Sequence, residues 1–159
     1  METNHSTKLN FTLALTRMVV GFVVLSHGVQ KLFGWFGGYG FEGTMGFFTN
    51  TIGLPYAFGV LIIIAETFGM LALIAGLFTR FLSIAMALIM LGAIFTTHGQ
   101  FGYYMNWSGA LKGEGFEFHI LLIALSLVNA VNGAGAWSLD TIWGKKAFKT
   151  KKSPQTEVA

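Results

Sequence analysis

The sequence predicts an all-α integral membrane protein, a bundle of four helices that crosses the bilayer four times. Of its 159 residues, 53% are hydrophobic and only 11% are charged, and the mean hydropathy is +0.63. A soluble domain carries about a quarter charged residues to cover its surface. The apolar residues gather in four stretches, at 11–33, 56–78, 81–97 and 116–131. The 21 glycines follow no collagen period, and such usage is typical of closely packed transmembrane helices.

Each apolar stretch is interpreted as a helix, because lipid offers the backbone no hydrogen-bonding partner. The first two are long enough for a hydrocarbon core of ~30 Å, whereas the last two need interfacial residues to complete the crossing. We therefore expect one transmembrane domain over 11–142, preceded by a short cytoplasmic segment (1–10) and followed by a basic cytoplasmic tail (143–159).

The distribution of basic residues predicts that both termini lie in the cytoplasm. In that orientation eight of the ten lysines and arginines lie at or near the cytoplasmic side, and only Lys31 and Lys112 lie near the outer side. Five of the ten fall between Lys145 and Lys152. We expect this tail to touch anionic lipid headgroups, and such clustering in a tail argues against a nucleic-acid-binding face.

The connections differ in length. A tight cytoplasmic turn at 77–80 is predicted to join the second and third helices, and longer outer connections cover 34–55 and 98–115. Both outer connections are rich in glycine and aromatic residues. We favour an aromatic belt at the membrane interface for them. A lid over an outward-facing pocket is the alternative.

Ionisable residues inside spanning segments are costly, so each is a hypothesis about function. His27 and Lys31 share one face of the first helix near its outer end. Glu66 lies near the middle of the second helix, at a depth that roughly matches His27. A buried carboxylate must be protonated, paired or hydrated. We expect a network of Glu66 with His27 and Lys31; a polar clamp that only fixes the helix register is the other interpretation.

Further polar residues lie where the third helix ends and the fourth begins. His98 ends the third helix, and Glu117 and His119 open the fourth. Residues two apart on a helix are separated by about 200° and cannot face one site. Ala124 and Val128 share the Glu117 side, and we expect Glu117 to face inward, with His119 at the interface.

The resulting ligand-binding candidates share a place in the outer half of the bundle: His27, Lys31, Glu66, His98 and Glu117. Such acid–base groups in a partly desolvated pocket could bind and protonate a small polar head group. Two histidines could also hold a haem iron, but His27 and His98 lie near the rim, so we disfavour haem. We predict no metal site. The absence of cysteine excludes disulfides and thiol redox chemistry in this chain.

Four short motifs occur in a characteristic order around the hydrophobic segments. They are Arg17-x3-Gly21-x5-His27-Gly28-x2-Lys31-Leu32, Glu66 with Gly69, Gly76-Leu77-Phe78-Thr79-Arg80, and Gly133-x-Gly135-x2-Ser138-Leu139-Asp140. In order and spacing the chain, from about residue 10 to residue 142, resembles the DoxX family of small bacterial membrane proteins. We expect packing or topology roles for Arg17, Gly69, Gly76, Arg80 and Asp140.

The resemblance implies a four-helix, multi-pass protein of the bacterial inner membrane with a link to redox physiology, since the family takes its name from a thiosulfate:quinone oxidoreductase subunit. The leading hypothesis is a redox-associated protein whose outer-half pocket binds a quinone-like or other small amphipathic molecule, at most as a membrane subunit of a quinone-linked oxidoreductase. One alternative is a non-enzymatic scaffold or assembly subunit of an oxidoreductase complex. Another is a transporter of a small solute or protons, which would require a homo-oligomer.

Overall fold

The computed structural model describes residues 2–143, and every regular element in that range is a helix. The elements, in chain order, are α1 (Glu2–Phe33), the 3-10 turn η1 (Trp35–Gly37), α2 (Gly40–Gly46), the π-helical turn η2 (Phe47–Thr51), α3 (Tyr56–Ile64), the π-helical turn η3 (Ala65–Gly69), α4 (Met70–Ala75), α5 (Thr79–Ala93), the π-helical turn η4 (Ile94–His98), the 3-10 turn η5 (Gly99–Phe101) and α6 (Glu117–Asn132). The all-α prediction is confirmed.

Three helical segments are long and apolar enough to cross a membrane: Ser6–Phe33, Tyr56–Ala75 and Thr79–Phe101. The fourth, α6, is apolar but shorter. Its 16 residues span about 24 Å at 1.5 Å per residue, less than the ~30 Å hydrocarbon core. As expected, α6 therefore depends on flanking residues to complete a crossing. The predicted cytoplasmic location of both termini stays a prediction, and the lysines at 145–152 lie outside the described residues.

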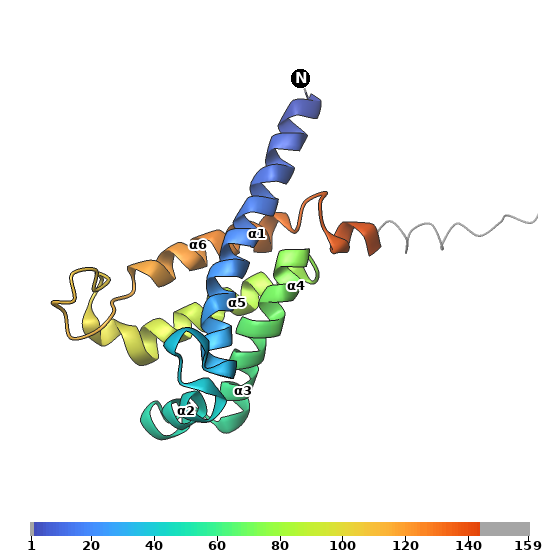
Figure 1. Ribbon diagram of the computed structural model, residues 1–159. Helices are drawn as coiled ribbons and strands as arrows, with labels where there is room; N and C mark the ends of the chain where they lie inside the picture. The colour runs from blue at the N-terminus through green and yellow to red at the C-terminus, as the bar shows by residue number, and fades with distance from the viewer. Residues whose placement is uncertain (1, 144–159) are drawn as a thin grey trace, which may run out of the picture.

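The helices form two crossed layers. In Figure 1, α1 and the continuous α3–η3–α4 segment run steeply, and α5 and α6 form a hairpin oblique to them. α1 packs against η3, α4 and α6, and α5 packs along α6. The outer connection folds into α2 and η2 beside the start of α3. α1 therefore packs against both the α3–η3–α4 segment and the α5–α6 hairpin.

Two apolar clusters form the core. The larger cluster takes side chains from four helices: Val20 and Val24 of α1, Met70 and Leu73 of α4, Met86 and Met90 of α5, and Leu122 of α6. The smaller lies beneath the outer connection and contains Met45, Phe48 and Ile63. The larger cluster separates the polar groups at the two ends of the bundle.

One end of the bundle gathers the motif residues for which we expected packing or topology roles. Arg17 is buried and donates to the carbonyls of Ala134, at 2.8 Å, and Trp137. Gly76 has a left-handed backbone (φ 72°), and a Cβ there would overlap the Arg17 guanidinium. These contacts fix the segment after α6 against α1 and the α4–α5 turn.

Asp140 and two further motif residues complete this end. The carboxylate of Asp140 accepts the backbone N–H groups of Phe78 (2.8 Å) and Thr79 (2.9 Å), which lie at the unpaired N-terminus of α5. Arg80 lies beside Gly133, and Gly69 packs against Leu82 of α5. The Asp140 side chain therefore acts as a cap supplied from another part of the chain.

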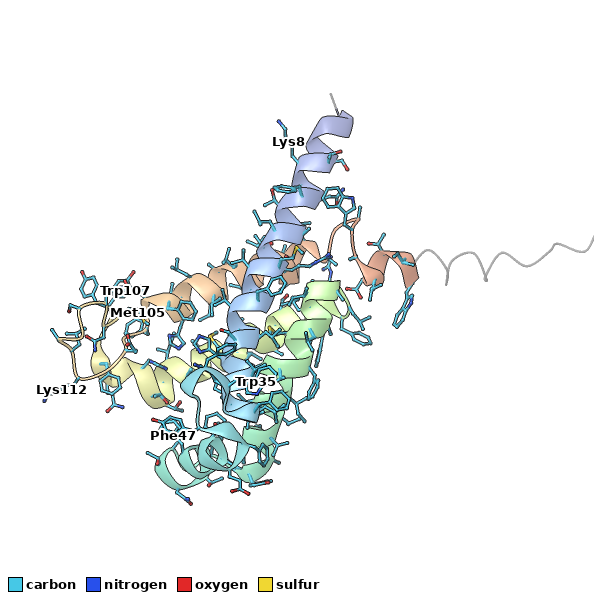
Figure 2. All side chains as sticks on the ribbon, viewed as in Figure 1. Lys8, Trp35, Phe47, Met105, Trp107 and Lys112 are labelled. Carbon is cyan, nitrogen blue, oxygen red and sulfur yellow. The ribbon has the colours of Figure 1, made fainter. Side chains whose placement is uncertain are left out.

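Several helix boundaries differ from the predicted ones. α1 begins at Glu2 rather than near residue 11, and its N-terminal part projects beyond the bundle, where Lys8 is labelled (Figure 2). Hydropathy marks the segment that lipid or protein can bury, not where the helix begins. The second helix ends at Ala75 because Gly76 turns left-handed, and the third begins at Thr79 rather than at residue 81.

Candidate functional site

An ion pair between α1 and η3 lies at the centre of the site. The Nζ of Lys31 contacts Oε2 of Glu66. The Glu66 side chain is only 2% exposed, whereas that of Lys31 is 29% exposed. The buried carboxylate is thus paired, as the sequence led us to expect. His27 does not join this pair directly, and its ring lies 6.2 Å from that of Phe118 on α6.

A glycine lets the two backbones approach closely enough for this pairing. Gly28 is buried on α1, and a Cβ at this position would overlap the carbonyl of Glu66 and come within 2.8 Å of the Thr67 nitrogen. Any side chain here would push η3 away from α1. Gly28 therefore allows η3 to approach α1 closely enough for Glu66 to reach Lys31.

Beside this pair lies a cavity of about 410 Å³, here named the polar cavity. Its volume falls within the range of small-molecule sites. Its ionisable lining residues are His27, Lys31, Glu66, His98, Glu114 and His119. Four of the five ligand-binding candidates thus border one space. The sequence did not identify Glu114 or His119 as lining residues.

The expected orientation of α6 was wrong. His119 is 7% exposed and faces the polar cavity, and Leu122, Ser126 and Asn129 are buried on the same face. Ala124 and Val128, which share the Glu117 side, are exposed. Apolar residues do not identify the inward face of a membrane helix, because lipid tails are as apolar as the protein core. The small polar Ser126 was the available signal.

His98 and His119 lie against each other with their rings tilted. The ring centroids of His98 and His119 lie 4.1 Å apart at an interplanar angle of 43°. His98 Nδ1 lies 2.8 Å from the carbonyl oxygen of Glu114. A carbonyl only accepts, so Nδ1 carries a proton and donates in this hydrogen bond. His119 Nδ1 is buried and finds no hydrogen-bonding partner in residues 2–143.

The segment between η5 and α6 covers the polar cavity. Met105, Trp107 and Glu114 of this segment line it, and Figure 2 shows Met105 and Trp107 together at the outer end of the α5–α6 hairpin. Glu117 holds the cover in place rather than lining the cavity. Its Oε1 accepts the Met105 backbone N–H at 2.9 Å and the Trp107 indole N–H at 3.1 Å.

A second cavity of about 440 Å³, the lateral cavity, adjoins the polar cavity. Both are lined by Lys31, Glu66, Ala93 and His98, so they meet at the ion pair. The rest of its wall is chiefly apolar and comes from η2 and the segment after it, α3 and α5, together with Thr96 and Thr97 of η4. An amphipathic surface thus runs from charged groups to aliphatic and aromatic side chains.

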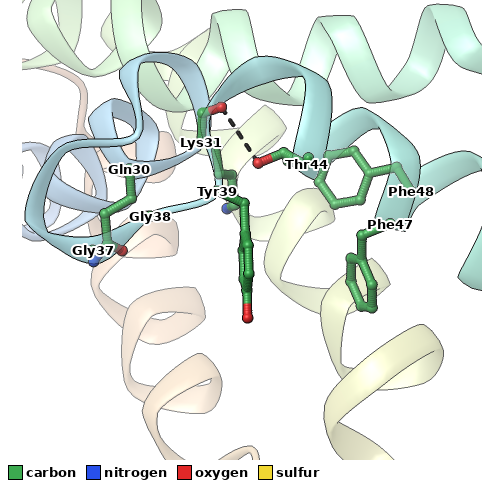
Figure 3. A pocket seen from close by; sticks show the side chains of 9 residues that line it. Gln30, Lys31, Gly37, Gly38, Tyr39, Thr44, Phe47 and Phe48 are labelled. Carbon is green, nitrogen blue, oxygen red and sulfur yellow. Dashed lines mark hydrogen bonds between the residues drawn. The ribbon is translucent and has the colours of Figure 1, made fainter.

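A third cavity, about 640 Å³, lies under the outer connection and is named the loop cavity. Figure 3 shows Tyr39, Thr44, Phe47 and Phe48 around it, with the Thr44 hydroxyl donating to the Lys31 carbonyl at 3.3 Å. Lys31 lines all three cavities. The outer connection, predicted as loop, thereby holds the end of α1 in position.

The π-helical turns coincide with the site. Residues 2–143 contain three such turns, η2, η3 and η4. Each contributes to the lateral cavity, through Phe47 and Phe48, through Glu66, and through His98 with its two preceding threonines. π turns widen a helix by one residue and occur often at functional sites. They displace the backbone where Glu66 and His98 meet the cavities.

The donor set around the cavities does not resemble a metal centre. Within residues 2–143, no three histidine, aspartate or glutamate side chains are grouped as metal ligands would be. The acid–base groups instead form an ion pair and an imidazole pair that line the same cavity. Together they offer hydrogen-bond donors and acceptors to a polar group.

Comparison with known proteins places the chain in a family. The DoxX family model matches residues 12–99. The chain is also 31% identical over 139 residues to a protein of Bacillus subtilis (strain 168) that is named "Putative oxidoreductase CatD", and the match covers 87% of this chain and 89% of that relative. No solved structure matches the chain. The resemblance to the DoxX family is thus confirmed, and the chain belongs to this family of membrane proteins.

Proposed function

We propose that this protein is a redox-associated protein of the bacterial inner membrane that binds a quinone-like molecule in the polar cavity. The observation that carries the proposal is the position of the Lys31–Glu66 pair, whose carboxylate is buried where a polar and a mostly apolar cavity meet. Binding sites of amphipathic molecules combine a few fixed polar groups with a mostly apolar wall. The name of the Bacillus subtilis relative supports the redox association.

In this proposal the ion pair and the imidazole pair hold the two carbonyl oxygens of the ring. Lys31 Nζ donates to one oxygen. His119, whose buried Nδ1 is unpaired in the described chain, bonds the other. An unpaired buried polar atom is costly, and a bound polar group would remove that cost. Glu66 and His27 are the groups that would exchange protons with the bound molecule.

The electrons come from a partner oxidoreductase in this proposal. The chain has no cysteine, so it carries no thiol couple of its own. The protein then acts as a membrane subunit that positions the quinone, and its outer cover keeps water from the ring.

The proposal is tested by purifying the protein in mild detergent and measuring bound quinone by mass spectrometry. We expect the wild type to retain quinone, Glu66→Gln to lose most of it, and Glu42→Gln, at an exposed position on α2, to retain it. If Glu66→Gln and His27→Ala hold as much quinone as the wild type and lower only the melting temperature, the ion pair is a structural clamp. Proton or solute flux in liposomes above empty vesicles would favour transport.

A further inference from the structure

The lateral cavity is shaped for a long apolar chain that starts at the ion pair. Away from the residues it shares with the polar cavity, its apolar wall includes Phe47 and Phe48 of η2, Phe58 and Ile62 of α3, and Leu88 and Ile89 of α5. None of these side chains has a hydrogen-bonding group, and the hydroxyls that also line the cavity belong to Thr96 and Thr97, next to His98. A head group held at Lys31 and Glu66 would therefore place any apolar extension along this wall.

The rim of the lateral cavity lies on the outside of the bundle. Phe47 is 41% exposed, Phe58 59% and Leu88 63%. The continuous α3–η3–α4 segment and α5 flank the turn at 76–78 and diverge from it in Figure 1, and η2 packs beside α3. Because these exposed residues are apolar, the surface around the rim contacts lipid rather than water.

The rim lies at the depth of the hydrocarbon. Gly92 lines the lateral cavity and is 13 residues after Thr79, the first residue of α5, which is about 20 Å along the helix axis. Because the hydrocarbon core is ~30 Å thick, a helix that enters it at Thr79 has Gly92 inside the hydrocarbon and not at the headgroups. A molecule that passes the rim thus comes from the acyl-chain region.

A glycine keeps the cavity open at this point. A Cβ built on Gly92 meets no atom within 4 Å. Glycine in the middle of a helix costs roughly 1 kcal/mol relative to alanine. Gly92 is exposed and has an ordinary helical backbone, so neither packing nor a left-handed turn requires a glycine here. The remaining reason for a glycine at this position is that a side chain would fill part of the lateral cavity.

From these observations we infer that the lateral cavity is the tail site of the bound molecule. The ligand is a quinone with a long alkyl or isoprenoid tail, and it reaches the polar cavity sideways from the bilayer while its tail remains in the lateral cavity. This inference rests on the proposed function. A tail in lipid gains little hydrophobic free energy by entering an apolar cavity, so the lateral cavity contributes room for the tail rather than affinity.

We predict that filling the lateral cavity weakens the binding of a quinone with a tail and leaves the binding of a tail-less quinone unchanged. The probes are tail-less dimethoxymethylbenzoquinone and its decyl-chain derivative, titrated into full-length protein in detergent while quenching of tryptophan fluorescence is followed. Trp107 lines the polar cavity and reports on head-group binding. The variants are Gly92→Phe, which fills the lateral cavity, and Leu91→Phe, which adds bulk at an exposed neighbour that does not line it. Melting temperatures establish that both variants are folded.

We expect Gly92→Phe to weaken binding of the decyl compound by about tenfold or more and to leave the tail-less compound within about twofold of the wild type. Leu91→Phe should change neither. If Gly92→Phe weakens both compounds equally, or neither, the tail lies elsewhere and the inference is overturned while the proposed function stands. If the wild type binds neither compound, the proposed function fails and the tail site fails with it. Gly92→Leu gives a smaller plug should the phenylalanine variant not fold, with the same selectivity expected.

Discussion

Lys31 Nζ and Glu66 Oε2 form an ion pair across the α1–η3 interface, in which the carboxylate side chain is 2% exposed and the lysine side chain 29%. Two charges at this depth are stable only together. Removing one partner leaves the other in an apolar environment without a counter-charge, whereas removing both leaves two apolar groups. The pair therefore has an asymmetric effect on stability.

We expect Glu66→Gln to lower the free energy of unfolding by roughly 1–3 kcal/mol, less than the 3–5 kcal/mol typical of a fully buried pair because Lys31 is partly exposed. The double variant Lys31→Met with Glu66→Leu should be less destabilised than Glu66→Gln. Denaturant or thermal unfolding in detergent measures both. A Glu66→Gln protein no less stable than the exposed-site control Glu42→Gln would rule out this role for the pair.

Gly28 should tolerate no side chain. Its Cβ would overlap the Glu66 backbone, so Gly28→Ala must separate α1 from η3, at a cost of about 1–3 kcal/mol. Gly46→Ala is the matched control, since Gly46 is helical and its Cβ would meet only the Asn50 side chain, at 4.0 Å. There alanine should be neutral or slightly stabilising. Equal melting temperatures for the two variants would contradict the close approach.

His119 should trade stability against binding. Its Nδ1 is buried without a partner in the described residues, and replacing such a group by an apolar one of similar volume is often neutral or stabilising. We expect His119→Leu to melt at the wild-type temperature or above it and to bind tail-less quinone at least about tenfold more weakly. A variant that loses stability and keeps its affinity would show that His119 serves packing instead.

Glu117 should hold the cover over the polar cavity. Its carboxylate accepts the Met105 backbone N–H and the Trp107 indole N–H. Glu117→Ala removes both acceptors, and we expect faster amide hydrogen exchange in residues 102–116 with little change in α5. Unchanged exchange in that segment would mean that its remaining contacts, such as Asn106 with Leu111, suffice to hold it.

Much of the fold follows from composition and periodicity. The four apolar stretches are the four helical segments. The similar depth of His27 and Glu66 predicted a network of Glu66 with His27 and Lys31, and of these two partners Lys31 forms the ion pair. Arg17 and Asp140 were expected to serve packing or topology. In the structure Arg17 donates to the carbonyl of Ala134 and Asp140 accepts the backbone N–H of Phe78, so both hold segments together at one end of the bundle.

The cavities and the face of α6 did not follow. Hydropathy cannot distinguish a lipid-facing valine from a core valine. The inward-facing position was therefore assigned to Glu117, whereas the structure places His119 there. The π turns that place Glu66 and His98 depend on tertiary packing and have no simple sequence signal. Glu114 reaches the polar cavity through an irregular segment whose path no periodicity encodes.

The most direct measurement of the central claim is photolabelling with an azido-quinone in membranes, followed by mapping of the labelled peptides. We predict label on peptides that contain His98, His119 or the Lys31–Glu66 region, reduced by excess unlabelled quinone and lost in Glu66→Gln. Label confined to exposed apolar positions such as Phe95 or Val131, and unaffected by the competitor, would contradict quinone binding at the ion pair.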